Sequence, residues 1–331
     1  MTVLSAPSRT KRKGILKEIA ETVRRGKKFL IASHENPEGD AIGSILALGW
    51  ALRQLGKKVT IFNSDPVPDI LAFLPGAEEI VRRPPKNARF DAAFALDCGD
   101  RKRLGEAFPE RKRTGRLINV DHHGSNTQFG DVNLVDPRAS STAEMVFDLI
   151  RELSVKISLP ISENIYTGIL TDTGSFHYSN TTAKTFAVAR KCVLVGAEPW
   201  KIAEKAYENQ PIARLRLLPA VLKTLKLEEG GRVSSVVVTR RMLARAGAVP
   251  ALTEDFINFP RSLKGTEVAL LFREVGPKKY RVSFRSRGKI DVSLVSRVFQ
   301  GGGHPNAAGC TVAGSLREVR AKVLKQVRAA F

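Results

Sequence analysis

Residues 117–124, LINVDHHG, place an aspartate and two histidines directly after a short apolar run. Short apolar runs that are bounded by turn residues are typical of buried strands. The segments 28–33, 58–63 and 91–96 have the same character, and a stretch of helical spacing separates the first from the second. This alternation predicts an α/β fold with a mainly parallel sheet flanked by helices, because parallel strands need helical crossovers.

The pattern of apolar residues changes twice along the 331-residue chain. Helical spacing dominates the middle of the chain, and strand-like runs return after residue 232. We therefore predict a larger domain over residues 1–205, a helical linker over residues 206–230 and a smaller α+β domain over residues 231–331.

The cysteines and the apolar segments indicate the cellular compartment of the protein. Cys98, Cys192 and Cys310 are far apart and form no CxxC pair, which fits a reducing compartment. The first residues lack the apolar core of a signal peptide. The longest apolar run, residues 41–52, is too short to span a bilayer. We expect a cytoplasmic protein without a membrane partner.

The charge is strongly basic and unevenly distributed. The chain carries a formal net charge of +21. From residue 230 onward there are 19 lysines and arginines against 6 acidic residues, a net charge of +13. This excess predicts a polyanionic partner such as a nucleic acid, and the alternative interpretation is a basic surface that serves solubility alone.

Metal-binding side chains follow three of the predicted strands, and one more lies in a polar break of the helical region. Ligand sites in parallel sheets lie beyond the carboxyl ends of the strands, so we expect these side chains to converge. The candidates are His34, Glu38, Asp40, Asp97, His122 and Asp172. Taken singly, each has an ordinary explanation: Asp97 in a turn, Asp172 as a helix cap and His34 in a plain loop.

The chemistry of this set favours divalent metal ions. Several carboxylates can share one site as anions only if cations neutralise them. Imidazole and carboxylate ligands without thiolates suit Mn²⁺, Mg²⁺ or Fe²⁺ better than structural zinc. Six ligands exceed what one ion with an open position needs, so the sequence predicts two ions that share a bridging carboxylate.

Two segments of the basic C-terminal region have phosphate-binding character. Residues 301–306, GGGHPN, contain glycines that allow backbone N–H groups to approach a phosphate, and His304 adds a donor. The alternative interpretation is a flexible turn. Residues 283–287, SFRSR, end a predicted strand with arginines suited to bidentate phosphate contacts.

Taken together, the motifs resemble those of the DHH phosphoesterase superfamily. HENPEGDAIGS, LDCGD, DHHG and TDTGSF resemble its four motifs in the correct order across roughly residues 28–180. VSFRSR and GGGHPNAAG resemble the DHH-associated domain, so the resemblance covers most of the chain. The two-domain length resembles the NrnA-like branch of oligoribonucleases and 3′-phosphoadenosine-5′-phosphate phosphatases.

The resemblance implies a role for each candidate residue. One metal ion would be bound by His34, Glu38 and Asp97, and the other by Asp40, Asp97, His122 and Asp172. Asp121 would orient His122, and His123 would contact the scissile phosphate. Nucleotide binding would fall to residues of the second domain: Arg285, Ser286, Gly302, Gly303 and His304. The family usually has aspartate at the position of Glu38.

The implied activity is metal-dependent hydrolysis of short single-stranded RNA or DNA oligonucleotides, or of nucleotide phosphates, in a cleft between the domains. Mn²⁺ is the expected metal, with Mg²⁺ or Fe²⁺ as alternatives, and a homodimer is the assembly to test. Three other functions remain open: a cyclic or linear dinucleotide phosphodiesterase, an inorganic pyrophosphatase, and a non-catalytic RNA-binding protein.

Overall fold

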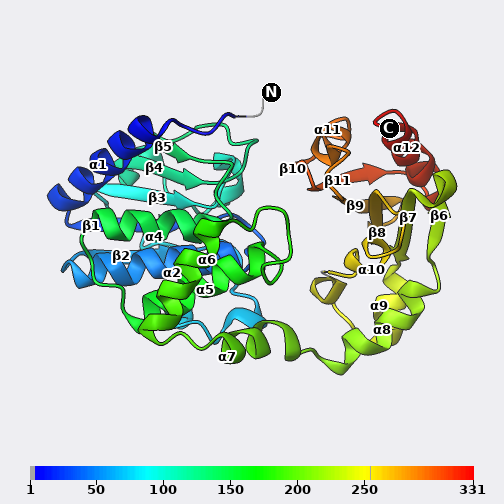
Figure 1. The fold of residues 1–331 in the computed structure, drawn as a ribbon, viewed down its shortest axis with the longest axis horizontal. Coiled ribbons are helices and arrows are strands. Elements are labelled where there is room, and N and C mark those ends of the chain that lie inside the picture. Colours follow the sequence, from blue (N-terminus) through cyan, green and yellow to red (C-terminus); the bar gives the residue numbers. More distant parts are fainter. Residues whose placement is uncertain (1–3, 254) are drawn as a thin grey trace. The chain divides into compact units, whose positions relative to one another are not determined.

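A computed structural model describes residues 4–253 and 255–331, with the side chain of His304 outside the described part. The chain divides into two compact units, Met1–Asn209 and Gln210–Phe331 (Figure 1). The predicted α/β class with a smaller α+β unit is confirmed. Helix α8 (Ile212–Leu222), which lies within the segment expected as a linker, packs against the core of the second unit.

The first unit contains a five-stranded, entirely parallel sheet of order β2-β1-β3-β4-β5. Its strands are β1 (Lys28–Ala32), β2 (Lys58–Phe62), β3 (Ala92–Leu96), β4 (Arg116–Asp121) and β5 (Val132–Val135). The main helices are α1 (Arg9–Arg25), α2 (Gly39–Gln54), α4 (Thr142–Glu152), α5 (Leu159–Asp172), α6 (Ala183–Val195) and α7 (Pro199–Ala203).

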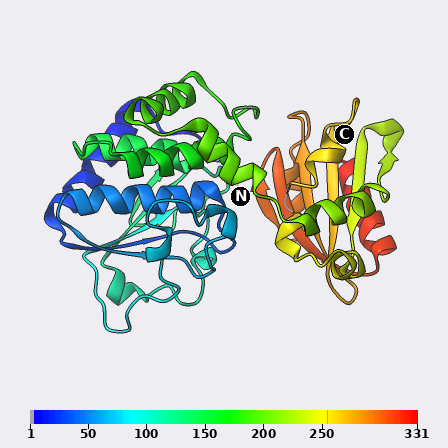
Figure 2. The same ribbon diagram turned by 90° about the horizontal axis from the view of Figure 1, so that it is seen from below.

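The two faces of this sheet are covered differently. Successive residues of a strand point to opposite faces, so Phe29 and Ile31 pack into the large core beneath the long helices. Leu30 and Ala32 pack into a smaller core on the other face. There the covering segments are loops and short helices such as η3 (Arg101–Leu104) and α3 (Arg111–Thr114), as Figure 2 shows.

Small residues bring α2 and α5 close together beside the carboxyl ends of the strands. A Cβ at Gly43 would overlap the backbone carbonyl of Asn164 on α5. A Cβ at Gly168 would lie 2.6 Å from the Cβ of Ala143 and 2.9 Å from Asp40 Oδ1. Glycine at position 168 therefore allows α5 to pack directly against the start of α2, where Asp40 lies.

The second unit is a six-stranded mixed sheet of order β10-β11-β9-β8-β7-β6, in which only β7 and β8 pair in parallel. Its strands are β6 (Lys226–Glu228), β7 (Val233–Val238), β8 (Val268–Gly276), β9 (Lys279–Ser286), β10 (Gly302–His304) and β11 (Ala307–Ala313). The helices after α8 are α9 (Arg240–Ala246), α10 (Asn258–Arg261), α11 (Val292–Arg297) and α12 (Leu316–Arg328). No helix among the described residues is long and apolar enough to cross a membrane.

Candidate metal centre

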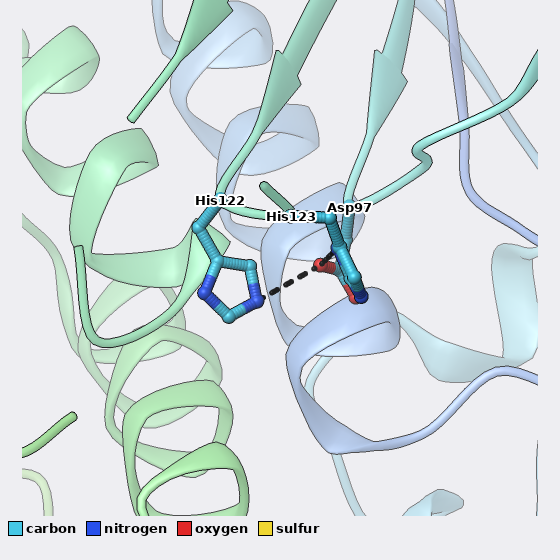
Figure 3. Close-up of side chains that lie close together, drawn as sticks. All are labelled: Asp97, His122 and His123. Atoms are coloured by element: carbon cyan, nitrogen blue, oxygen red, sulfur yellow. Dashed lines mark ion pairs between the residues drawn. The ribbon is translucent and has the colours of Figure 1, made fainter. Parts of the chain in front are cut away.

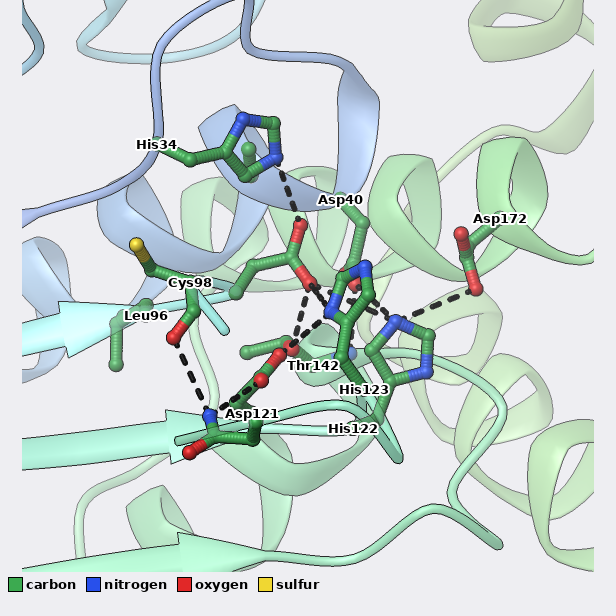
Figure 4. Close-up of polar contacts among 12 residues, drawn as sticks. His34, Asp40, Leu96, Cys98, Asp121, His122, His123, Thr142 and Asp172 are labelled. Atoms are coloured by element: carbon green, nitrogen blue, oxygen red, sulfur yellow. Dashed lines mark hydrogen bonds and ion pairs between the residues drawn. The ribbon is translucent and has the colours of Figure 1, made fainter. Parts of the chain in front are cut away.

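Six predicted ligands and His123 meet beyond the carboxyl ends of β1, β3 and β4. Figure 4 shows His34, Asp40, His122, His123 and Asp172 among them. Their potential ligand atoms form three overlapping groups, and the atoms within each group lie within 4.8 Å of one another. The groups are Asp97 with His122 and His123, then His34 with Glu38 and Asp97, and finally Asp40 with His122 and Asp172. The parallel strands therefore bring together residues that are up to 138 positions apart in the chain.

Asp97 lies at the centre of the cluster (Figure 3). Its Oδ2 is 3.5 Å from His34 Nε2, and its Oδ1 is 3.5 Å from His122 Nε2. Oδ1 also accepts a hydrogen bond of 3.0 Å from Thr142 Oγ1. The backbone of Asp97 has a φ of 53°, a left-handed conformation that aspartate and asparagine adopt more readily than most residues. This turn directs the carboxylate away from the strand and toward the histidines.

Asp40 is fully buried and accepts hydrogen bonds from the start of α4. The backbone N–H of Thr142 donates to Oδ2 at 2.6 Å, and that of Ala143 donates to Oδ1 at 2.8 Å. These N–H groups belong to the first turn of α4, where no intrahelical acceptor exists. Asp40 therefore caps a helix from another element, and its Oδ2 also lies 3.8 Å from His122 Nε2.

Glu38 precedes α2 as its N-cap, and its carboxylate makes two contacts. Oε1 accepts from the backbone N–H of Ala41 at 3.1 Å, while Oε2 lies 3.2 Å from His34 Nε2. The other ring nitrogen of His34, Nδ1, is 2.7 Å from the Glu35 carbonyl oxygen and 3.0 Å from Arg103 Nη2. The longer side chain of glutamate thus reaches the cluster from the cap position.

Asp121 contacts His123, whereas the sequence led us to expect that it orients His122. Its Oδ1 lies 2.7 Å from His123 Nδ1. His122 instead has its Nδ1 3.3 Å from the Ala139 carbonyl oxygen. Asn126 donates to Asp121 Oδ2 at 2.5 Å and to Asn119 at 2.8 Å, which fixes the orientation of the Asp121 carboxylate.

Three supporting residues were not predicted from the sequence: Thr142, Asn126 and Asn180. Asn180 Nδ2 donates to the backbone oxygen of Asp172 at 3.1 Å and to its Oδ2 at 3.2 Å. Asn126 lies only three residues after the paired histidines, and this proximity in the sequence could have indicated that it supports them. Nothing in the local sequence singles out Thr142, which is 45 residues away from Asp97.

Charges in the cluster shift several pKa values. Burial alone would lower the pKa of His34, but Glu38 and Asp97 raise it well above its usual value. Burial likewise opposes a charged His123, yet Asp121 raises its pKa to about 9. Burial raises the pKa of Asp172 to about 6. Burial also opposes ionisation of Asp97, but the hydrogen bond and charge of His34 hold its pKa well below the usual range.

The spacing of the donor atoms fits divalent ions. His122 Nε2 faces carboxylate oxygens of Asp97, Asp40 and Asp172 at 3.5, 3.8 and 3.7 Å, which are too long for hydrogen bonds. An ion bonded to nitrogen and oxygen ligands at about 2.1 Å holds neighbouring ligand atoms roughly 3 to 4 Å apart. The set is therefore spaced as a candidate site for divalent cations.

The predicted nucleotide-binding residues lie at one edge of the second sheet. Arg285 on β9 pairs with Ala307 on β11, and Ala307 pairs in turn with His304 on β10. Arg285 and His304 therefore share one register two strands apart, a separation of roughly 10 Å. Ser286 is buried and donates from its hydroxyl to Asn306 Oδ1 at 3.0 Å.

The glycine run is a strand and not the flexible turn that was the alternative interpretation. Residues Gly302–His304 form β10, which pairs antiparallel with β11. Gly303 has a φ of 138°, and a Cβ there would overlap the Ala307 carbonyl oxygen. Glycine is required at this position because the backbone approaches its partner strand closely.

Comparisons with known proteins agree with this architecture. A model described as "DHH family, N-terminal domain" matches residues 28–171, and a model described as "DHHA1 domain" matches residues 235–331. The chain is 37% identical over 302 residues to the bifunctional oligoribonuclease and PAP phosphatase NrnA of Thermus thermophilus, covering 90% of this chain and 88% of that one. It is 27% identical over 301 residues to NrnA of Bacillus subtilis, covering 89% and 92%.

A crystal structure of an exopolyphosphatase-related protein from Bacteroides fragilis has a similar fold. It superimposes with a TM-score of 0.89 at 28% identity and covers 96% of both chains.

Proposed function

Because the chain belongs to the DHH family, we propose that it is a metal-dependent phosphoesterase that hydrolyses short oligonucleotides and 3′-phosphoadenosine 5′-phosphate. The observation that carries this proposal is the overlap of three candidate ligand groups, of which two share Asp97 and two share His122. The similarity to two proteins described as oligoribonuclease and PAP phosphatase supports the substrate class.

Two divalent ions, Mn²⁺ in the first place and Mg²⁺ or Fe²⁺ as alternatives, would be bound by the six residues predicted as ligands. The first ion would use His34, Glu38 and Asp97. The second would use Asp40, His122 and Asp172, together with Asp97, whose Oδ1 lies 3.5 Å from His122 Nε2. When bound, such ions activate water and neutralise charge on the phosphoryl group. Glu38 keeps its place in this scheme because its Oε2 lies 3.2 Å from His34 Nε2.

His123 would bind the phosphoryl group of the substrate. Its Nδ1 is held by Asp121 at 2.7 Å, so the proton-bearing Nε2 of the charged ring is the atom that can donate to a phosphoryl oxygen. Since Asp121 raises the pKa of His123 to about 9 against the effect of burial, the metal-free site favours the charged form of the ring that this donation requires. A positive donor stabilises the charge that develops on phosphoryl oxygens in the transition state.

The second unit would bind the nucleotide through Arg285, Ser286, Gly302, Gly303 and His304. The net charge of +13 beyond residue 230 favours a polyanionic ligand. The shared register of Arg285 and His304 supports a joint role, since β9 and β10 flank β11 and both residues pair with its Ala307. In this scheme the first unit carries the chemistry and the second unit carries affinity.

Turnover of four substrates, each with Mn²⁺ and with EDTA, tests the proposal. The substrates are pApA, 3′-phosphoadenosine 5′-phosphate, cyclic di-AMP and pyrophosphate. Mn²⁺-dependent hydrolysis of the first two is the expected result. A preference for cyclic di-AMP would indicate a dinucleotide phosphodiesterase, and a preference for pyrophosphate an inorganic pyrophosphatase. Binding of pApA without any turnover would indicate a non-catalytic RNA-binding protein.

A further inference from the structure

Immediately after Asp172, residues 173–180 form a loop of unusual backbone conformation. Gly174, Ser175 and Phe176 are three successive left-handed residues, with φ values of 54°, 60° and 64°. Residues other than glycine pay an energetic cost for this conformation, which persists only where the surroundings enforce it.

Several contacts hold this loop in place. The ring of Phe176 stacks on Phe186 with centroids 5.3 Å apart, and it meets Tyr166 edge-on at 6.1 Å. The backbone N–H groups of His177 and Tyr178 both donate to the Thr173 carbonyl oxygen, at 3.0 and 2.9 Å. The loop is therefore a fixed structure in spite of its backbone strain.

The loop is also tied directly to the candidate metal centre. Asn180 at its end donates to both the backbone and the carboxylate of Asp172, and it also donates to the Ser140 carbonyl oxygen at 2.7 Å. Asp172 in turn faces His122 Nε2 at 3.7 Å. Any displacement of this loop is therefore transmitted to a candidate ligand.

The same loop presents an aromatic surface. The Tyr178 ring packs over the Cα of Gly174, where a Cβ would overlap the ring. The exposed His177 lies beside Tyr178, with ring centroids 6.0 Å apart and an interplanar angle of 60°. A supported and exposed ring within a few residues of a candidate metal ligand suits a ligand with a flat aromatic part.

We propose that His177, supported by Tyr178, is a specificity-determining residue that stacks on a nucleobase of the oligonucleotide. This inference rests on the proposed function. Proteins that bind single strands commonly stack bases on aromatic rings, histidine included, and such stacking tolerates any base. The loop would thereby select nucleotides over phosphoesters without a base, while the neighbouring cluster acts on the phosphate.

A double-mutant cycle between His177 and the bases of the substrate tests the proposal. Wild type and His177→Ala are assayed with pApA and with two analogues, each lacking one adenine. For wild type, loss of the contacted adenine should raise KM about 10-fold. His177→Ala should raise KM for pApA by a similar factor, and its KM should change little further when the analogue without the contacted adenine replaces pApA. If removal of the adenine raises KM by the same factor in His177→Ala as in wild type for both analogues, the proposal is overturned.

Further variants separate stacking from other roles. His177→Phe should retain the wild-type KM because phenylalanine also stacks, and a His177→Phe protein as impaired as His177→Ala would overturn the proposal. Trp200→Ala is the matched control, since Trp200 is an exposed aromatic residue on α7 of the same unit. It should leave KM unchanged. Thermal melting checks that every variant is folded.

The glycine under the ring supplies an independent test. Gly174→Ala places a Cβ against the Tyr178 ring at a backbone φ of 54°, so it should displace the ring and raise KM for pApA. A Gly174→Ala protein with the wild-type KM would contradict a role for the loop conformation. If wild type itself fails to hydrolyse pApA with Mn²⁺, the proposed function fails. If wild type turns over and the cycle shows no coupling, only the role of His177 fails.

Discussion

The central position of Asp97 leads to a prediction in which catalysis and stability respond differently to two substitutions. Asp97 is a member of two of the three candidate ligand groups and touches Thr142 as well. We expect both Asp97→Asn and Asp97→Ala to lose activity, because neither side chain supplies an anionic ligand to the two proposed ions. A fall in kcat of at least about 1,000-fold corresponds to about 4 kcal/mol of lost transition-state stabilisation.

Stability should distinguish the two variants. Both remove the negative charge from among the histidines, so this effect cancels when they are compared. Alanine additionally pays about 1 kcal/mol for the left-handed backbone at φ 53°. It also loses the hydrogen bond from Thr142 Oγ1, worth about 1 kcal/mol. Asparagine keeps both features, so the metal-free Ala variant should melt roughly 4–8 °C below the Asn variant.

The assay combines initial rates on pApA across a Mn²⁺ titration with thermal melting in EDTA. Thr142→Val is a control that removes the hydroxyl while leaving the ligand set intact, so it should lower stability more than kcat. An Asp97→Asn protein within tenfold of the wild-type kcat at saturating Mn²⁺ would refute the central role of this carboxylate. Equal melting temperatures for Asn and Ala would refute the backbone argument.

Three further predictions follow from the structure. Glu38→Asp should be tolerated because aspartate is a good helix N-cap. Glu38→Ala should raise the Mn²⁺ concentration required for activity and lower the free energy of unfolding by about 1 kcal/mol, because the cap on Ala41 is lost. An unchanged metal titration for Glu38→Ala would exclude this position as a ligand. Although burial lowers the pKa of His123, Asp121 raises it to about 9. In EDTA, the contribution of the charged His123 to stability should therefore be complete below pH 6.5 and be lost as the pH rises toward 9. A melting temperature that stays constant from pH 6.5 to 9 would contradict this. Arg285→Ala should raise KM for oligonucleotides of two to five residues without changing Mn²⁺ affinity. Arg281→Ala, on the same strand, should leave this KM unchanged. Equal KM values for wild type and Arg285→Ala, or a wild-type preference for long polymers, would argue against a binding role for the second unit.

The sequence alone was sufficient to predict the cluster because the topology of a parallel sheet determines where strand ends lie. Asp97 and His122 follow neighbouring strands, β3 and β4, so their proximity follows from strand order alone. His34 follows β1, which pairs with β3 on its other side. The apolar runs indicate the strands and their parallel direction, which is enough to place these side chains at one edge of the sheet; the order of the strands comes from the structure.

The sequence could not predict how side chains are oriented beyond the strand ends. Asp121 is the last residue of β4 and His122 and His123 lie in the loop, where the strand alternation no longer applies. The contact of Asp121 with His123 therefore does not follow from the sequence. The contact of Thr142 with Asp97 depends on the placement of α4, and the pairing of β10 with β11 depends on the second sheet as a whole. The sequence around each residue does not indicate such long-range contacts.

The start of α4 links the candidate metal centre to the packing of the first unit. Its first turn supplies two N–H groups to Asp40 and a hydroxyl to Asp97, so the helix end offsets part of the negative charge before any cation binds. Burial still raises the pKa of Asp40 well above its usual value, which means that hydrogen bonds alone do not compensate for its desolvation. The negative charge that these hydrogen bonds leave uncompensated favours cation binding, because a cation relieves the repulsion between Asp40, Asp97 and Asp172. The start of α4 meanwhile holds Asp40 and Asp97 in position. Gly168 is part of the same arrangement, since a side chain there would separate α5 from Asp40 and thereby move Asp172 away from the shared histidine.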